Sequence, residues 1–131
     1  MKLTKKSTVQ DIFDQFNVQF PYLHLEFYDH ENGIDQTQSH QVSHQTLLED
    51  LNPELIDTIF VVSPEITVSE FEKMMKDKYQ LHIQVFRRSS DIWLQTSATD
   101  HWTLEKQNGK GHRSTLTYDI DPITISDFDV E

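Results

Sequence analysis

Apolar residues recur at helical spacing in two segments of the chain, one near the N-terminus and one in the middle. The first series is Val9, Ile12, Phe13, Phe16 and Phe20, and the second is Val68, Phe71, Met74, Met75 and Tyr79. Such spacing predicts two amphipathic helices, each with one face to bury. Thr8 and Thr67 precede the two series and each has an acid three residues later, which predicts a capping box at both helix starts.

After each predicted helix the apolar period changes from helical spacing to two. The alternating residues are Leu23, Leu25 and Phe27 in the first case, and Leu81, Ile83 and Val85 in the second. This alternation predicts two amphipathic strands. A weaker strand at residues 2–4 and a stronger one at 58–62 precede the helices. The order strand, helix, strand therefore occurs twice. Residues of about 7–28 and 66–86, which cover the helix and the second strand of each unit, form an internal repeat.

Two such units in 131 residues predict a single α+β domain that covers residues 1–131. We expect a ferredoxin-like, split βαβ sheet with both helices on one face. The first strand is rich in lysine, which suits the centre of that sheet poorly. A β-grasp-like mixed sheet with a helix packed across it is therefore the alternative.

Further elements are predicted around and after the second unit. Residues 91–96 form a fifth strand, joined by a tight turn at Ser89 and Ser90 to make a hairpin. Residues 30–46, rich in Gln, His and Ser, form a flexible loop. The acidic extension 111–131 carries a final strand.

A short helix follows the hairpin. Thr99 and Asp100 are predicted to cap its start, and Gly109 is predicted to end it after Asn108. Its Trp102, together with Leu104, anchors it in the core.

Composition and charge narrow the range of functions. The net charge is −11, and residues 7–72 contain thirteen carboxylates but no Lys or Arg. This charge argues against nucleic acid and anionic membranes as partners. There is no cysteine, which suits a reducing cytoplasm. Because no phosphate-binding glycine motif occurs, no cofactor is expected.

The segments 84–89, 93–96 and 99–108 read QVFRRS, WLQT and TDHWTLEKQN. This series resembles a signature of small uncharacterised bacterial cytosolic proteins without an established activity. The resemblance covers most of residues 1–110. His101 stands where that family is expected to have a second Asp. The resemblance implies a bacterial cytoplasm and no particular chemistry.

Strand alternation also predicts a possible binding face. If the aliphatic residues face the helices, a mostly polar and aromatic set shares the opposite face, and Trp93 joins it if Ile92 and Leu94 point inward. Aromatic side chains and arginine are typical interface anchors, so this face is predicted to bind a protein partner or a second copy of the chain. The predicted partner-binding residues are His24, Tyr28, His82, Phe86, Arg88 and Trp93. Alternatively, the C-terminal segment covers them within the monomer.

The histidines give a weaker hypothesis of metal binding. His40 and His44 are four residues apart, with Asp29, His30 or Glu31 as further candidate ligands. The residues between the two histidines do not favour a helix, so a solvated loop is the default interpretation and no metal site is expected. We therefore predict a non-catalytic protein-interaction or regulatory module. The alternative is a small enzyme, or a ligand- or metal-binding domain, that uses histidine and carboxylate side chains.

Overall fold

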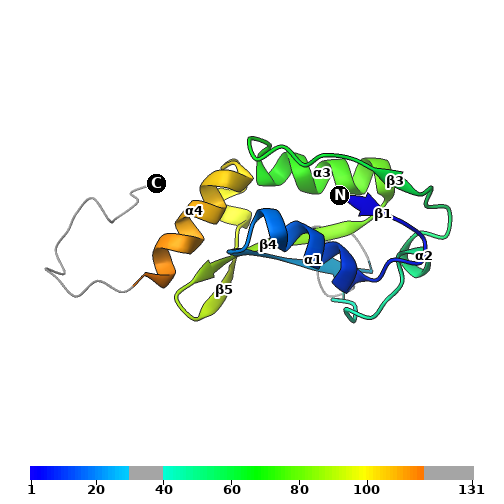
Figure 1. Cartoon of the computed structure of the whole chain (residues 1–131), viewed down its shortest axis with the longest axis horizontal. Helices are drawn as coiled ribbons and strands as arrows, with labels where there is room; N and C mark the ends of the chain where they lie inside the picture. The colour runs from blue at the N-terminus through cyan, green and yellow to red at the C-terminus, as the bar shows by residue number, and fades with distance from the viewer. Residues whose placement is uncertain (30–39, 117–131) are drawn as a thin grey trace, which may run out of the picture.

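The computed structural model describes residues 1–29 and 40–116 as a mixed α+β fold (Figure 1). These residues form two antiparallel sheets and four α-helices. The elements are β1 (Lys2–Leu3), α1 (Val9–Gln19), β2 (Leu23–Tyr28), α2 (Leu48–Leu51), β3 (Thr58–Ile59), α3 (Val68–Tyr79), β4 (His82–Ser89), β5 (Ile92–Gln95), a 3-10 turn (Ser97–Thr99) and α4 (Leu104–Thr115). The α+β class is therefore confirmed.

The two predicted capping boxes are both present. The Thr8 hydroxyl accepts a hydrogen bond from the Asp11 backbone N–H, and the Asp11 carboxylate accepts one from the Thr8 N–H. Thr67 and Glu70 make the same reciprocal pair at the start of α3. Each box satisfies two backbone donors that the first helical turn leaves unpaired. The start of each long helix is therefore encoded locally.

The strands of the described residues form two sheets rather than one. β2, β4 and β5 pair in that order, and β1 pairs with β3 in a separate sheet. The ferredoxin-like arrangement is not confirmed by this strand order. β3 is also shorter than the predicted strand 58–62, because its partner β1 contributes only two residues. Beyond that pairing Val61 is 91% exposed, so it does not pack on a sheet.

The core lies between the long helices and the three-stranded sheet. The predicted apolar faces are buried at Val9, Ile12, Phe16 and Phe20 in the first series and at Val68, Phe71 and Met75 in the second. The rings of Phe16 and Phe71 stack with centroids 5.3 Å apart, which joins the two helices. The ring of Phe20 packs on the same Phe16 ring, with centroids 5.0 Å apart. Burial of these side chains is the main stabilising contribution to the fold.

The last helix begins and ends later than predicted. Its N-cap is Thr103, not Thr99 or Asp100, because Thr99 ends the short 3-10 helix and Asp100 is the C-cap of that helix. The helix continues through Gly109 to Thr115. Glycine is a weak helix former but does not forbid a helix when tertiary contacts hold it. The predicted anchors Trp102 and Leu104 are both buried, which confirms that part of the prediction.

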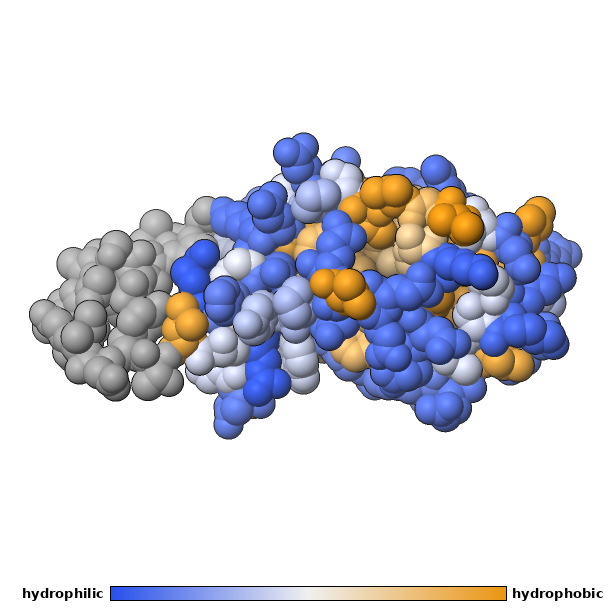
Figure 2. Space-filling view, in the orientation of Figure 1, coloured by the Kyte–Doolittle hydropathy of each residue, from blue (hydrophilic) through white to orange (hydrophobic). Residues whose placement is uncertain are grey.

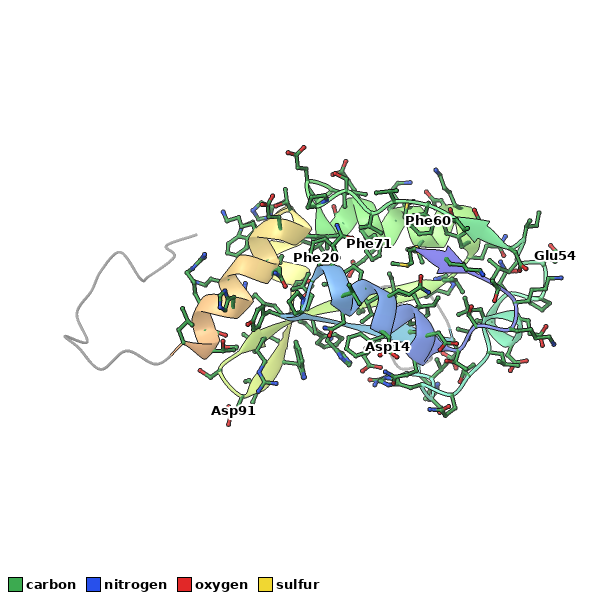
Figure 3. The ribbon with its side chains drawn as sticks, in the orientation of Figure 1. Asp14, Phe20, Glu54, Phe60, Phe71 and Asp91 are labelled. Atoms are coloured by element: carbon green, nitrogen blue, oxygen red, sulfur yellow. The ribbon has the colours of Figure 1, made fainter. Side chains whose placement is uncertain are left out.

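The β4–β5 hairpin projects at the same end of the molecule as α4, while β1, β3 and α2 lie at the other end (Figure 1). In Figure 3, Asp91 marks the hairpin tip and Glu54 the opposite end. Ile92 and Leu94 are 54% and 37% exposed, so they do not point into the core, and the condition under which Trp93 is expected to join the opposite face is not met. The predicted C-terminal strand and residues 30–39 of the predicted loop lie outside the described residues.

Candidate metal centre

Strand β2 places His24 and Glu26 on one face of the sheet. Their neighbours Leu23, Leu25 and Phe27 point to the opposite face and are fully buried in the core. The hydrophobic alternation of β2 therefore fixes the side on which an imidazole and a carboxylate stand two residues apart.

A return segment, residues 40–47, brings His44 to the same place. The Val42 N–H donates to the Phe27 carbonyl at 2.9 Å, which lays the segment along the outer edge of β2. Two residues further, the His44 carbonyl accepts the N–H of Gln10, in the first turn of α1, also at 2.9 Å. The backbone of His44 is thus fixed between a strand edge and a helix start.

Three side chains converge at this point, from His24, Glu26 and His44. One Glu26 carboxylate oxygen contacts His24 Nε2, and the other lies 2.9 Å from His44 Nε2. One potential ligand atom from each residue lies within 4.8 Å of the other two. Glu26 is only 7% exposed, so both of its oxygens depend on these imidazoles rather than on water.

Gln10 determines which nitrogen of His44 carries the proton. The Gln10 amide oxygen lies 3.0 Å from His44 Nδ1 and can only accept a hydrogen bond, so it favours a proton on Nδ1. Nε2 then presents its lone pair to a carboxylate oxygen of Glu26. Two acceptor atoms 2.9 Å apart need a cation between them, which is either a second imidazole proton or a metal ion.

Aromatic rings enclose the His24 side of the cluster. Three ring centroids lie near the centroid of the His24 ring, those of Phe13 at 4.6 Å, Trp93 at 5.2 Å and Phe86 at 6.2 Å. Arg88 lies over the outer ring, with its guanidinium carbon 5.3 Å from the Trp93 centroid. An apolar wall lowers the local dielectric and strengthens the interaction of a bound cation with Glu26.

The six predicted partner-binding residues therefore divide into two groups. His24, Phe86, Arg88 and Trp93 lie around the cluster, since His24 pairs across the strands with Phe86 and Arg88 with Trp93. Tyr28 and His82 pair with each other at the other end of the β2–β4 ladder. Burial raises the pKa of Tyr28, and the nearby carboxylates Glu26 and Glu72 raise it further.

The two candidate metal histidines separate. His44 belongs to the cluster, but His40 is exposed and lies 3.6 Å from Asp29 instead. His30 and Glu31 lie outside the described residues. Glu26, which no metal hypothesis from the sequence included, is the central member. The spacing His24-Leu25-Glu26 in an alternating strand is the signal that could have drawn attention to it.

A second region with an unusual carboxyl group lies beside the same sheet. Glu72 of α3 accepts a hydrogen bond from the Val85 N–H at 2.9 Å. Burial raises the pKa of Glu72 to about 7, the Val85 N–H opposes that rise, and Asp100 adds to it. This carboxyl therefore changes its charge near neutral pH.

Among residues 1–29 and 40–116 no helix is both long and apolar enough to cross a membrane. Two hollows lie at the end of the molecule opposite the hairpin, with volumes of about 290 Å³ and about 520 Å³. Neither hollow is lined by a residue of the cluster.

Comparisons with protein-family models, curated proteins and solved structures found no match to this chain.

Proposed function

We propose that this chain binds one divalent transition-metal ion, with zinc as the first candidate, through His24, Glu26 and His44. The observation that supports the proposal is the convergence of two imidazoles and one buried carboxylate, with ligand atoms within 4.8 Å of one another. Imidazole nitrogen and carboxylate oxygen are ordinary zinc ligands, and two histidines with one carboxylate leave a fourth position for water or a ligand. The chain has no cysteine with which to build a thiolate site.

The surroundings favour an ion over a proton alone. The contact from Gln10 to His44 Nδ1 keeps the Nε2 lone pair directed at the cluster, as outer-shell partners do for metal-bound histidines. Each of the two ligand-bearing backbone segments is held by the sheet or by helix α1, so little ordering entropy is lost on binding. A rigid, partly desolvated set of three ligands is what a small divalent cation requires.

Zinc titration of the purified chain is expected to show one ion bound per chain. At a zinc concentration 100 times Kd, binding to the folded state adds about 2.7 kcal/mol, which corresponds to a rise in Tm of about 10 °C for a domain of this size. Binding is expected to weaken on acidification, because protons then compete with the ion for the imidazole nitrogens. Calorimetric titration and thermal unfolding with and without zinc measure these effects.

Single substitutions connect this result to the cluster. His44→Ala and Glu26→Gln are each expected to weaken zinc binding by more than about 100-fold, and Gln10→Ala by roughly 10-fold as an outer-shell change. His40→Ala is the matched control, since this histidine is exposed and lies outside the cluster. Equal zinc affinity in the wild type and His44→Ala, or a loss in His40→Ala, would contradict the proposal.

Self-association through β5 is a second candidate function, favoured by the exposed hairpin. β5 is the last strand in its sheet, and all four of its residues are exposed, with Ile92 at 54%. Figure 2 shows the surface as mainly hydrophilic with separate apolar patches. An unpaired strand edge with apolar side chains is a template for pairing with a second copy. This candidate interface includes Trp93 and Arg88, two of the six predicted partner-binding residues.

Sedimentation at increasing concentration is expected to show dimers of the wild-type chain that Ile92→Lys prevents, because a charge on the edge blocks pairing. Val18→Lys is the control, since Val18 is 87% exposed on α1 and distant in sequence from the hairpin. A wild type that stays monomeric at high concentration would remove this candidate, as would equal dimerisation of Ile92→Lys.

A further inference from the structure

The pairing of β2 with β4 is symmetric about one residue pair. Glu26 lies opposite Gln84, His24 lies opposite Phe86, and Tyr28 lies opposite His82. A two-fold rotation through the Glu26–Gln84 pair would therefore exchange the two strands and superpose His24 on His82. The short β1–β3 pair is antiparallel as well, as the same rotation requires.

Backbone hydrogen bonds at the helix starts give an independent match. In the first half the Gln10 N–H donates to the His44 carbonyl at 2.9 Å, and in the second half the Ser69 N–H donates to the Asp100 carbonyl at 2.8 Å. Each acceptor belongs to a segment that returns to the start of the long helix. Two isolated antiparallel bridges repeat the correspondence, Thr8 with Leu47 and Thr67 with Thr103.

Together these matches place His82, Gln84 and Asp100 at the positions of His24, Glu26 and His44. We infer that the chain consists of two equivalent units arranged as a two-fold pair, and that the second unit holds a counterpart of the zinc site in which Gln84 replaces the carboxylate of Glu26 and Asp100 replaces His44. This inference rests on the proposed function of the first unit. It predicts one ion per chain rather than two, because a neutral amide in place of Glu26 is a poor zinc ligand.

The residues around the counterpart also differ from those around the zinc site. Phe13 packs its ring against His24 at 4.6 Å in the first unit. The equivalent position in the second unit is Glu72, which follows Thr67 at the same interval as Phe13 follows Thr8. The Glu72 carboxylate accepts a hydrogen bond from the Val85 N–H at 2.9 Å, so it satisfies a backbone donor of strand β4. In the wild-type chain the counterpart therefore supports the fold and does not bind zinc.

Exchange of the differing ligands between the two units tests the inference. The exchange variant combines Glu26→Gln, His44→Asp, Gln84→Glu and Asp100→His, so the central cross-strand pair still contains one carboxylate and one amide. It is expected to bind one zinc ion, as the wild type does. His82→Ala should then abolish binding in the exchange variant and leave the wild type unaffected, and His24→Ala should do the reverse. Calorimetric titration with zinc chloride measures both.

The double variant Glu26→Gln with His44→Asp serves as the folding control. It is expected to fold and to bind no zinc, because the fold already accepts Gln and Asp at the equivalent positions. An exchange variant that is unfolded, or that folds without binding zinc, overturns the inference while wild-type binding upholds the proposed function. Absence of zinc binding by the wild type overturns the proposed function, and an unfolded double variant then overturns the equivalence of the two units as well.

Discussion

Gly111→Ala is expected to lower the free energy of unfolding by up to about 2 kcal/mol, although alanine is the better helix former. A Cβ at this position would lie 2.9 Å from the Tyr22 carbonyl oxygen and 3.2 Å from Arg87 Cγ. That carbonyl accepts the Arg88 N–H at 3.0 Å and cannot retreat freely. Helix α4 would have to move off the sheet, and such overpacking costs about 1 to 3 kcal/mol, more than the roughly 1 kcal/mol gained in helix propensity.

Gly109→Ala is the matched control on the same helix. Its Cβ would meet only the end of the Arg113 side chain, at an ordinary 3.5 Å. It is therefore expected to raise the free energy of unfolding by about 0.5 to 1 kcal/mol. Urea unfolding of the wild type and the two variants measures the difference. A stabilising Gly111→Ala would contradict the close approach of α4 to Tyr22.

Glu72→Gln is expected to stabilise the protein at about pH 8 and to have little effect at about pH 5. The pKa of Glu72 is about 7 in the folded protein and 4.5 by its ordinary value. Between these values the folded state binds the proton more tightly, so the stability that Glu72 contributes is present below pH 4.5 and is lost as the pH rises through 7. The difference between the two conditions is about 2 to 3 kcal/mol, since one pKa unit corresponds to about 1.4 kcal/mol.

In Glu72→Gln the new amide keeps an oxygen to accept the Val85 N–H, so the substitution removes only the charge. Glu70→Gln, on the exposed start of the same helix, is the control with opposite sign. Hydrogen bonds from the Thr67 backbone and hydroxyl hold the pKa of Glu70 below its ordinary value, so its ionised form stabilises the folded state and is lost on acidification. Urea unfolding at both pH values measures these effects. An equal change for Glu72→Gln at the two pH values would show that its carboxyl stays ionised.

The local elements were predictable from the chain because their signals are local. Thr8 and Thr67 with their acids encode the helix starts, and the alternation in 23–28 and 81–86 encodes two strands and the orientation of their side chains. The hairpin at 89–96 has the same origin. Each signal depends on residues within a few positions of one another, so no tertiary contact is needed to identify it.

The errors arose where distant contacts decide. Apolar character in 58–62 predicted a five-residue strand, but its partner among the described strands, β1, is two residues long. Gly109 predicted a helix end, but the packing of α4 against β4 and Tyr22 carries the helix on to Thr115. Local propensity is worth about 1 kcal/mol per residue, which a single tertiary contact can outweigh.

For the candidate site, the shared strand face of His24 and Glu26 could be predicted from the local pattern, because alternation with the apolar Leu23, Leu25 and Phe27, which are buried, leaves no other orientation. That His44, and not His40, completes the cluster follows from contacts between distant segments. Its position depends on the register of the return segment against the edge of β2 and on a hydrogen bond to α1. Sequence spacing carries no information on such a register, since it is set by backbone pairing between segments that are distant along the chain.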